Sequence, residues 1–329
     1  MTLFYPESAT DRDRWITEQR PARAMRNPRE PYGFFVEDEY APNGEALPVA
    51  TIFLTNRECP FHCAMCDLWR NTLEEPVPAG AIPAQIDFAL ARLPEARIVK
   101  LYNSGSFFDP RAIPVEDYAA IAERVRGFER VIVECHPAFV GERCVEFRDL
   151  LAGKLEVAMG LETVHPQILE MLNKRMTLDQ FADAADYLRK NGIEVRAFIL
   201  VQPPFMRPEE SLHWAQRSLN FAFDCGATAA TLIPTRGGNG AMETLAEAGA
   251  FAPPDLSIVE AAAEYGLRQS HGRVFPGRVF VDLWEVKRKA ECAACFEARL
   301  ERLRAMNLQQ KVIVPVSCAA CGGRVERAV

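Results

Sequence analysis

Short apolar segments alternate with amphipathic segments from residue 48 onward, and this alternation is the feature that most constrains the fold. The apolar segments predict strands near residues 49–55, 97–102, 130–134, 154–161, 193–201 and 228–233. Between them, apolar residues at helical spacing predict helices near residues 83–93, 115–127, 141–152, 166–173, 178–191 and 209–224. Strands that alternate with helices form a parallel sheet with right-handed crossovers. The pattern therefore predicts an α/β fold, a partial (β/α)6 barrel, whose functional site lies at the carboxyl ends of the strands.

The same pattern divides the chain into three segments. Residues 1–47 hold several prolines and no long apolar period, which predicts an N-terminal arm with one short helix and one strand near residues 32–36. Residues 48–285 form the barrel, including a further strand near residues 277–284. Residues 286–329 form a small C-terminal lobe with a helix near residues 296–306 and a strand near residues 312–316. The arginines of the arm form either a solvated surface or a contact to an anionic substrate or RNA.

Composition limits the class of protein. The chain has 329 residues, of which 49% are hydrophobic and 25% are charged, so it can bury a sizeable core. It has no apolar run long enough to span a bilayer and no signal peptide, so we expect a cytoplasmic protein without a membrane partner. The net charge of −7 and the pI of about 5.5 disfavour a broad nucleic-acid surface, because phosphate contacts need clustered Lys and Arg.

Three cysteines follow the first predicted barrel strand at the spacing C-x3-C-x2-C: Cys59, Cys63 and Cys66. Three thiolates in one loop suit a [4Fe-4S] cluster with one iron left open, since cysteine thiolates are the usual ligands of such clusters. An open coordination position is typical of a catalytic metal site. The alternatives are a zinc knuckle completed by His62 and a chance spacing.

Four further cysteines form two C-x2-C pairs in the C-terminal lobe, Cys292 with Cys295 and Cys318 with Cys321. Four thiolates predict a metal site. Zn2+ is the expected ion, because two such pairs make a closed tetrahedral site that stabilises a small lobe. An auxiliary iron–sulfur cluster is the main alternative, and unliganded cysteines are the other.

Polar residues stand at the carboxyl ends of three predicted strands. The loop after the second strand contains Asn103, Ser104, Gly105 and Ser106. Small residues let the backbone approach a ligand closely and hold an amine, although an ordinary turn also explains them. Glu134 and His136 end the third strand and are candidates for substrate contacts, and a structural, hydrogen-bonded His136 is the alternative. Glu162 ends the fourth strand, where its carboxylate suits a ribose diol unless it is a helix cap or a surface residue.

Two more candidates lie on the fifth predicted strand. Arg196 interrupts an otherwise apolar segment, and a buried guanidinium needs an anionic partner. That partner is either a ligand carboxylate, which a guanidinium matches with two hydrogen bonds, or a side chain in a buried salt bridge. Gln202 follows the end of this strand and is a candidate for a substrate contact.

The cysteine spacing resembles the signature of the radical S-adenosylmethionine (SAM) superfamily. Later motifs resemble the subgroup that contains the radical SAM subunit of archaeosine synthase, close to the elongator-catalytic-subunit and methylthiotransferase branch. These motifs are Ser-Gly-Ser-Phe, Glu-x-x-Pro-x-Phe-Val, Gly-Leu-Glu-Thr, Pro-Pro-Phe and Ile-Pro-Thr, in this order along residues 48–285. The archaeosine enzyme acts on a lysine-bearing deazaguanine in tRNA.

This resemblance implies that the first three cysteines hold a [4Fe-4S] cluster whose open iron chelates SAM. Reductive cleavage of SAM would then give a 5′-deoxyadenosyl radical, and an electron donor such as a flavodoxin or ferredoxin is required. The resemblance assigns the amino group of SAM to residues 103–106 and its ribose to Glu162. The carboxylate of SAM is then a candidate partner for Arg196.

The implied function is that of a radical SAM enzyme that abstracts hydrogen from a nucleobase or nucleoside. The subgroup implies tRNA as the carrier, whereas the acidic pI disfavours it. Residues 236–240, Arg-Gly-Gly-Asn-Gly, also replace the longer polar and basic stretch expected of the tRNA enzyme. Radical modification of a small molecule or peptide in a biosynthetic pathway is the second hypothesis. A non-enzymatic zinc-binding interaction protein is the third.

Overall fold

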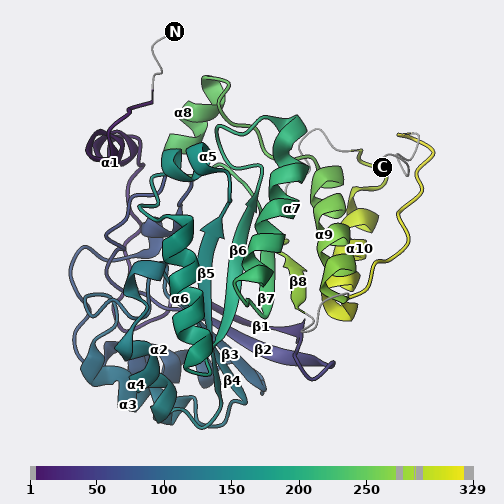
Figure 1. Cartoon of the computed structure of the whole chain (residues 1–329). Coiled ribbons are helices and arrows are strands. Elements are labelled where there is room, and N and C mark those ends of the chain that lie inside the picture. Colours follow the sequence, from purple (N-terminus) through teal and green to yellow (C-terminus); the bar gives the residue numbers. More distant parts are fainter. Residues whose placement is uncertain (1–4, 272–276, 285, 287–291, 322–329) are drawn as a thin grey trace.

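A single curved sheet forms the centre of the protein (Figure 1). The computed structural model describes residues 5–271, 277–284, 286 and 292–321. The sheet has eight strands in chain order, and β2 to β8 are parallel. The strands are β1 (Gly33–Tyr40), β2 (Ala46–Phe53), β3 (Ile98–Tyr102), β4 (Arg130–Cys135), β5 (Lys154–Glu162), β6 (Glu194–Val201), β7 (Ala229–Pro234) and β8 (Arg278–Val281). The predicted parallel α/β barrel is therefore confirmed, and the arm adds the antiparallel edge strand β1.

Most helices cover the outer face of this sheet, and the others lie at its carboxyl end (Figure 1). The helices are α1 (Ala9–Glu18), α2 (Ala81–Leu90), α3 (Tyr118–Arg124), α4 (Glu142–Leu150), α5 (Pro166–Met171), α6 (Leu178–Lys190), α7 (Pro208–Asp224), α8 (Ala241–Glu247), α9 (Leu256–His271) and α10 (Phe296–Gln309). Local sequence sets some of their ends. Thr177 and Gln180 form a capping box at the start of α6, where each side chain binds a backbone N–H. No described helix is both long and apolar enough to cross a membrane.

The strand predicted near residues 312–316 is wrong. In the structure these residues are irregular and pair with no described strand. The buried guanidinium of Arg302 on α10 donates instead to the carbonyl oxygens of Ile313 at 2.9 Å and Val314 at 3.1 Å. A side chain from α10 therefore takes the hydrogen bonds that a neighbouring strand would have formed.

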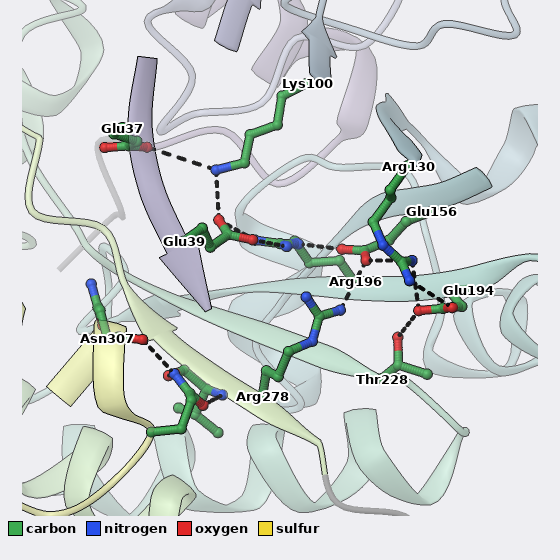
Figure 2. A network of polar contacts seen from close by, with 12 residues as sticks. Glu37, Glu39, Lys100, Arg130, Glu156, Glu194, Arg196, Thr228, Arg278 and Asn307 are labelled. Carbon is green, nitrogen blue, oxygen red and sulfur yellow. Dashed lines mark hydrogen bonds and ion pairs between the residues drawn. The ribbon is translucent and has the colours of Figure 1, made fainter. Parts of the chain in front are cut away.

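Side chains alternate between the two faces of each strand. On β5, Val157 and Met159 join the core beneath the helices, whereas Glu156 points to the inner face. Here Glu156 is fully buried and accepts from Arg130 at 3.2 Å, Arg196 at 2.6 Å and Arg278 at 2.9 Å (Figure 2). The inner face near the amino ends of the strands is thus closed by this charged network together with a small apolar cluster that includes Val49, Ile98 and Ile132.

Glu39 on β1 extends this ionic network across the sheet. Its carboxylate binds Lys100 Nζ at 2.6 Å and Arg196 Nη2 at 2.5 Å (Figure 2). Burial by itself raises the pKa of Glu39, but Arg196 and Lys100 together hold it far below its ordinary value. The carboxylate therefore stays ionised, and the antiparallel strand is tied to strands on the far side of the barrel.

Candidate active site

The loop after β2 carries Cys59, Cys63 and Cys66 at the carboxyl end of the parallel sheet. All three thiols are partly buried, and none forms a disulfide. Burial raises the pKa of each thiol to about 12. A thiolate needs a nearby positive charge under these conditions, and a bound metal centre supplies one.

The ligand set of this loop suits an iron–sulfur cluster. It offers three free thiols, and cysteine thiolates are the usual ligands of the separate irons of such a cluster. His62 does not complete a zinc site, since its ring faces Asp13 and Glu58.

Two asparagines hold the backbone of the cysteine loop. Asn173 Nδ2 donates to the carbonyl of His62 at 2.8 Å. Asn239 Nδ2 donates to the carbonyls of Ala64 at 2.8 Å and Cys66 at 3.0 Å. Both side chains are buried, so the loop is positioned by segments that follow α5 and β7. Sequence analysis missed both residues, because a buried amide that binds a backbone carbonyl leaves no local pattern.

The N-terminal arm holds the same loop from the other side. Arg20 Nη1 binds Glu58 at 2.6 Å, and Arg23 binds Glu58 and the hydroxyl of Thr72. Arg12 is buried and donates to the carbonyl of Glu170 on α5 at 2.9 Å. Figure 1 shows α1 beside α5 and α8 at this end of the barrel. These three arginines are neither solvated nor free to contact RNA, because each binds a partner within the chain.

The predicted SAM loop lies directly against the cysteine loop. A Cβ on Gly105 would be 3.3 Å from the Cβ of Cys59. The backbone N–H groups of Asn103, Gly105 and Ser104 point at the carboxylate of Glu134, and Asn103 N lies 3.2 Å from Glu134 Oε2. Desolvation nevertheless raises the pKa of Glu134 to about 7. Glu134 is thus a partly neutral carboxyl group below the loop.

Asn103 carries the clearest sign of a missing ligand. Its side chain is fully buried, yet neither Nδ2 nor Oδ1 has a hydrogen-bond partner. Buried amide groups are almost always hydrogen-bonded in proteins. By contrast, Ser104 Oγ lies 2.9 Å from the hydroxyl of Tyr32, and Ser106 Oγ accepts from the N–H of His136. The residues of this loop fit a bound polar cofactor, with Asn103 as its free donor and acceptor.

Glu162 ends β5 in a left-handed conformation with φ of 64°. Its Oε1 binds Lys174 Nζ at 2.7 Å, and both side chains are buried. Burial alone lowers the pKa of Lys174, but Glu162 and the thiolate forms of Cys63 and Cys59 raise it above its ordinary value. A fixed ammonium therefore lies beside the cysteine loop, where an iron–sulfur cluster would concentrate negative charge.

The Glu162–Lys174 pair needs a glycine at position 160. A Cβ there would lie 2.1 Å from Glu162 Oε1 and 2.4 Å from Lys174 Nζ. We expect Gly160→Ala to separate this buried pair and lower the free energy of unfolding by about 2 kcal/mol or more. Gly127→Ala, where a Cβ meets nothing within 4 Å, is the matched control and should change it by about 0.5 kcal/mol at most. Denaturant unfolding of both variants checks this, and equal stabilities would contradict it.

The structure corrects the predicted contact between Arg196 and the SAM carboxylate. Arg196 lies near the amino end of β6, whereas the cysteine loop lies at the carboxyl end of the sheet. Its guanidinium is 2% exposed and binds Glu39 and Glu156. The alternative, a buried salt bridge, therefore accounts for this charge.

His136 and Gln202, two candidates for substrate contacts, bind protein atoms instead. His136 Nδ1 accepts from the N–H of Ala138, and Nε2 lies 2.9 Å from the carbonyl of Lys174. Burial lowers the pKa of His136 to about 3, so the ring is neutral and Nε2 is the donor. Gln202 Nε2 donates to the carbonyl of Ala252, while its Oε1 accepts from Ser211. Both residues position loops around the barrel mouth.

Aromatic side chains form a layer between the ionic network and the cysteine loop. Tyr102 and Phe198 follow Lys100 and Arg196 by two residues, so they share the inner face one step nearer the carboxyl edge. Tyr102 packs against Phe198 at 6.1 Å and against Phe53 of β2 at 6.3 Å between ring centroids. All three residues are partly exposed. Sequence analysis missed this layer, although its signal is the charged–x–aromatic pattern on the strands.

The four C-terminal cysteines come together as predicted. Cys292 Sγ lies 3.9 Å from Cys318 Sγ, and Cys295 Sγ lies 3.9 Å from Cys321 Sγ. All four sulfurs lie within 4.8 Å of one another, which is close enough for one metal centre. This group precedes and follows α10, which packs against β8, whereas the cysteine loop follows β2.

Known proteins resemble this chain in sequence and in fold. Residues 53–215 match the radical SAM superfamily. The chain is 26% identical over 259 residues to an uncharacterized protein of Methanocaldococcus jannaschii, covering 74% of this chain and 71% of that protein. It is 28% identical over 232 residues to archaeosine synthase subunit beta of Methanosarcina acetivorans, covering 66% of this chain and 67% of that protein.

The fold is also similar to a solved structure, Streptococcus suis SuiB bound to its precursor peptide SuiA. The TM-score is 0.50 at 14% sequence identity, and the match covers 69% of this chain. It covers 47% of that chain, so the present chain spans about half of the solved protein. At this sequence identity, the match shows that the two proteins share a fold and does not indicate a shared function.

Proposed function

Since this chain is an enzyme of the radical SAM superfamily, we propose that it modifies a nucleobase or nucleoside held against the aromatic layer inside its barrel. Membership of this family excludes the hypothesis of a non-enzymatic zinc-binding protein. The single observation that carries the choice of substrate is the position of Phe53, Tyr102 and Phe198. They lie between the cysteine loop and the ionic network of the barrel, and all three residues are partly exposed.

The cofactors are assigned to the residues that fit them. Cys59, Cys63 and Cys66 would hold the [4Fe-4S] cluster, and the free amide of Asn103 would bind SAM. When bound, the two cofactors supply a 5′-deoxyadenosyl radical that abstracts a hydrogen atom. Lys174 orients the carboxylate of Glu162 for the ribose through the contact at 2.7 Å. An electron donor such as a flavodoxin or ferredoxin would reduce the cluster.

Stacking favours a planar substrate. A base stacked on an aromatic side chain gains about 1–3 kcal/mol, and every base offers such a face. The relationship to archaeosine synthase subunit beta supports the same class of substrate. Arg12, Arg20 and Arg23, which would be candidates for phosphate contacts, already bind the protein itself. These three arginines therefore give no support for a contact to the RNA backbone, and we propose the base as the recognised part of the substrate.

Anaerobic turnover assays test the proposal. The reconstituted protein is given SAM and dithionite with a lysine-bearing deazaguanine nucleoside, with tRNA containing that base, or with a peptide pool, and 5′-deoxyadenosine is measured. We expect the nucleoside or the tRNA to raise the formation of 5′-deoxyadenosine at least about tenfold. The mass of that substrate should also change. Stimulation by peptides alone would replace our proposal with the peptide hypothesis.

Variants of the aromatic layer separate recognition from the radical chemistry. We expect Phe53→Leu and Phe198→Leu to raise the KM for the base about tenfold, because about 1.4 kcal/mol of stacking is lost. Phe34→Leu is the matched control, since Phe34 packs on the outer core against Phe88. Cleavage of SAM without substrate should persist in all three variants. An unchanged KM in both inner variants would exclude the aromatic layer as the binding surface.

A further inference from the structure

The four C-terminal cysteines have the spacing of a site for one ion. Two sulfur pairs lie at 3.9 Å, and the whole group lies within 4.8 Å. A tetrahedral zinc site with Zn–S bonds of about 2.3 Å has sulfurs about 3.8 Å apart. We propose that Cys292, Cys295, Cys318 and Cys321 bind one Zn2+ and that this ion fastens α10 over the open edge of the sheet.

The geometry disfavours the auxiliary cluster. Thiolates on the separate irons of a [4Fe-4S] cluster lie farther apart than thiolates on one ion. The C-terminal group is compact, with all four sulfurs within 4.8 Å of one another. Four sulfur ligands without oxygen also exclude calcium and magnesium, which take oxygen ligands.

Helix α10 lies against β8, which pairs only with β7 in the described sheet. Asn307 Oδ1 accepts from the N–H of Val281 at 2.8 Å, and its Nδ2 donates to the carbonyl of Val281 at 2.9 Å. Gln310 forms the same pair of bonds with Val279 at 2.7 and 2.8 Å. Figure 2 shows Asn307 on α10 directed toward this strand. Two side-chain amides thus take the place of a ninth strand and satisfy the open edge.

Buried charges attach α10 to its neighbours on the other side. Arg302 is 5% exposed and binds Glu260 at 3.1 Å and Glu264 at 2.6 Å, both on α9. The same guanidinium binds the carbonyls of Ile313 and Val314 in the segment that follows α10. This segment leads directly to Cys318 and Cys321.

The four cysteines therefore close a loop around the edge-capping helix. Cys292 and Cys295 stand immediately before α10, and Cys318 and Cys321 follow the segment bound by Arg302. A metal ion that joins the two pairs removes much of the conformational freedom of the open chain between them. Its role follows from this position, because the ion keeps Asn307 and Gln310 against β8.

Metal content and hydrogen exchange test both parts of the proposal. The full-length protein, reconstituted anaerobically, should contain about four irons and one zinc. Cys318→Ser/Cys321→Ser should lose the zinc and keep the iron, and the amides of β8 should exchange at least tenfold faster. Cys225→Ser is the control, since this lone thiol lies at the end of α7 and should leave zinc and exchange unchanged.

A second variant keeps the test decisive if the cysteine variant does not fold. Asn307→Ala/Gln310→Ala retains all four thiols, so it should keep one zinc while the exchange of β8 rises at least tenfold. About eight irons, or one extra iron in place of zinc, would overturn the assignment of the ion. Loss of zinc to a chelator without faster exchange in β8 would overturn its role at the sheet edge.

Discussion

Glu156→Gln should lower the free energy of unfolding by about 3–5 kcal/mol, because removal of one partner leaves buried charges uncompensated. Glu156 is fully buried and accepts from guanidiniums on β4, β6 and β8 (Figure 2). Without it, Arg278 keeps no carboxylate among the described residues, and its Nη1 already lacks a partner. Arg130 and Arg196 would depend on Glu194 and Glu39 alone.

Glu194→Gln is the matched control for this substitution. Glu194 also binds Arg130, at 2.7 Å, but its side chain is 28% exposed and water can replace it. We expect a loss of about 1 kcal/mol or less for that variant. Denaturant unfolding, followed by fluorescence on samples of equal metal content, compares the two. Variants of equal stability would show that Glu156 is not the centre of the network.

The pH dependence of stability gives an independent check on Glu156. Burial alone raises the pKa of this carboxyl group, but Arg196, Arg278 and Arg130 lower it from 4.5 to about 2. A folded-state pKa below the unfolded value stabilises the fold above about pH 4.5, and this contribution is lost as the pH falls toward 2. The Glu156→Gln variant lacks this carboxyl group. Its free energy of unfolding should therefore not show the part of the decrease at low pH that protonation of Glu156 causes.

Cys63→Ala should abolish cleavage of SAM, with a loss of at least about a thousandfold. Two thiols would remain in the loop, each with its pKa raised by burial, and they cannot hold a cluster that needs three thiolates. Iron should fall to near zero. The zinc proposed for the C-terminal cysteines should stay, because those thiols belong to a separate group.

Iron analysis and anaerobic assay of 5′-deoxyadenosine measure this effect. Cys225→Ala is the control and should keep both iron and activity, since Cys225 is a single, partly exposed thiol at the end of α7. A Cys63→Ala protein that still bound about four irons and cleaved SAM would contradict the assignment of the cluster to this loop.

Several features of this protein followed from local patterns alone. The apolar runs near residues 130–134 and 193–201 became β4 and β6 within one or two residues, because buried parallel strands need continuous apolar sequence. The two C-x2-C pairs also predicted the grouping of the four C-terminal cysteines. In each case the residues that act together are close in the sequence.

The tertiary structure alone decided which charges meet. Arg196 finds Glu39, 157 residues earlier in the chain, and Arg20 finds Glu58 across 38 residues. An arginine in an apolar strand indicates that an anionic partner exists. The sequence does not show whether that partner is a cofactor carboxylate or a side chain on another strand. The choice depends on which strands the sheet brings together and on which end of the barrel each residue occupies.

The same limit applied to the inner surface of the barrel. Phe53, Tyr102 and Phe198 come from three strands, and no local period connects them. They form one layer because neighbouring parallel strands are in register, so residues nearer the carboxyl ends than the ionic network lie side by side across the sheet. The sequence by itself determined most strands, the cysteine loop and the grouping of the two C-x2-C pairs, since these depend on local patterns. Curvature of the sheet decided the ionic network and the aromatic layer, because both are contacts between distant strands.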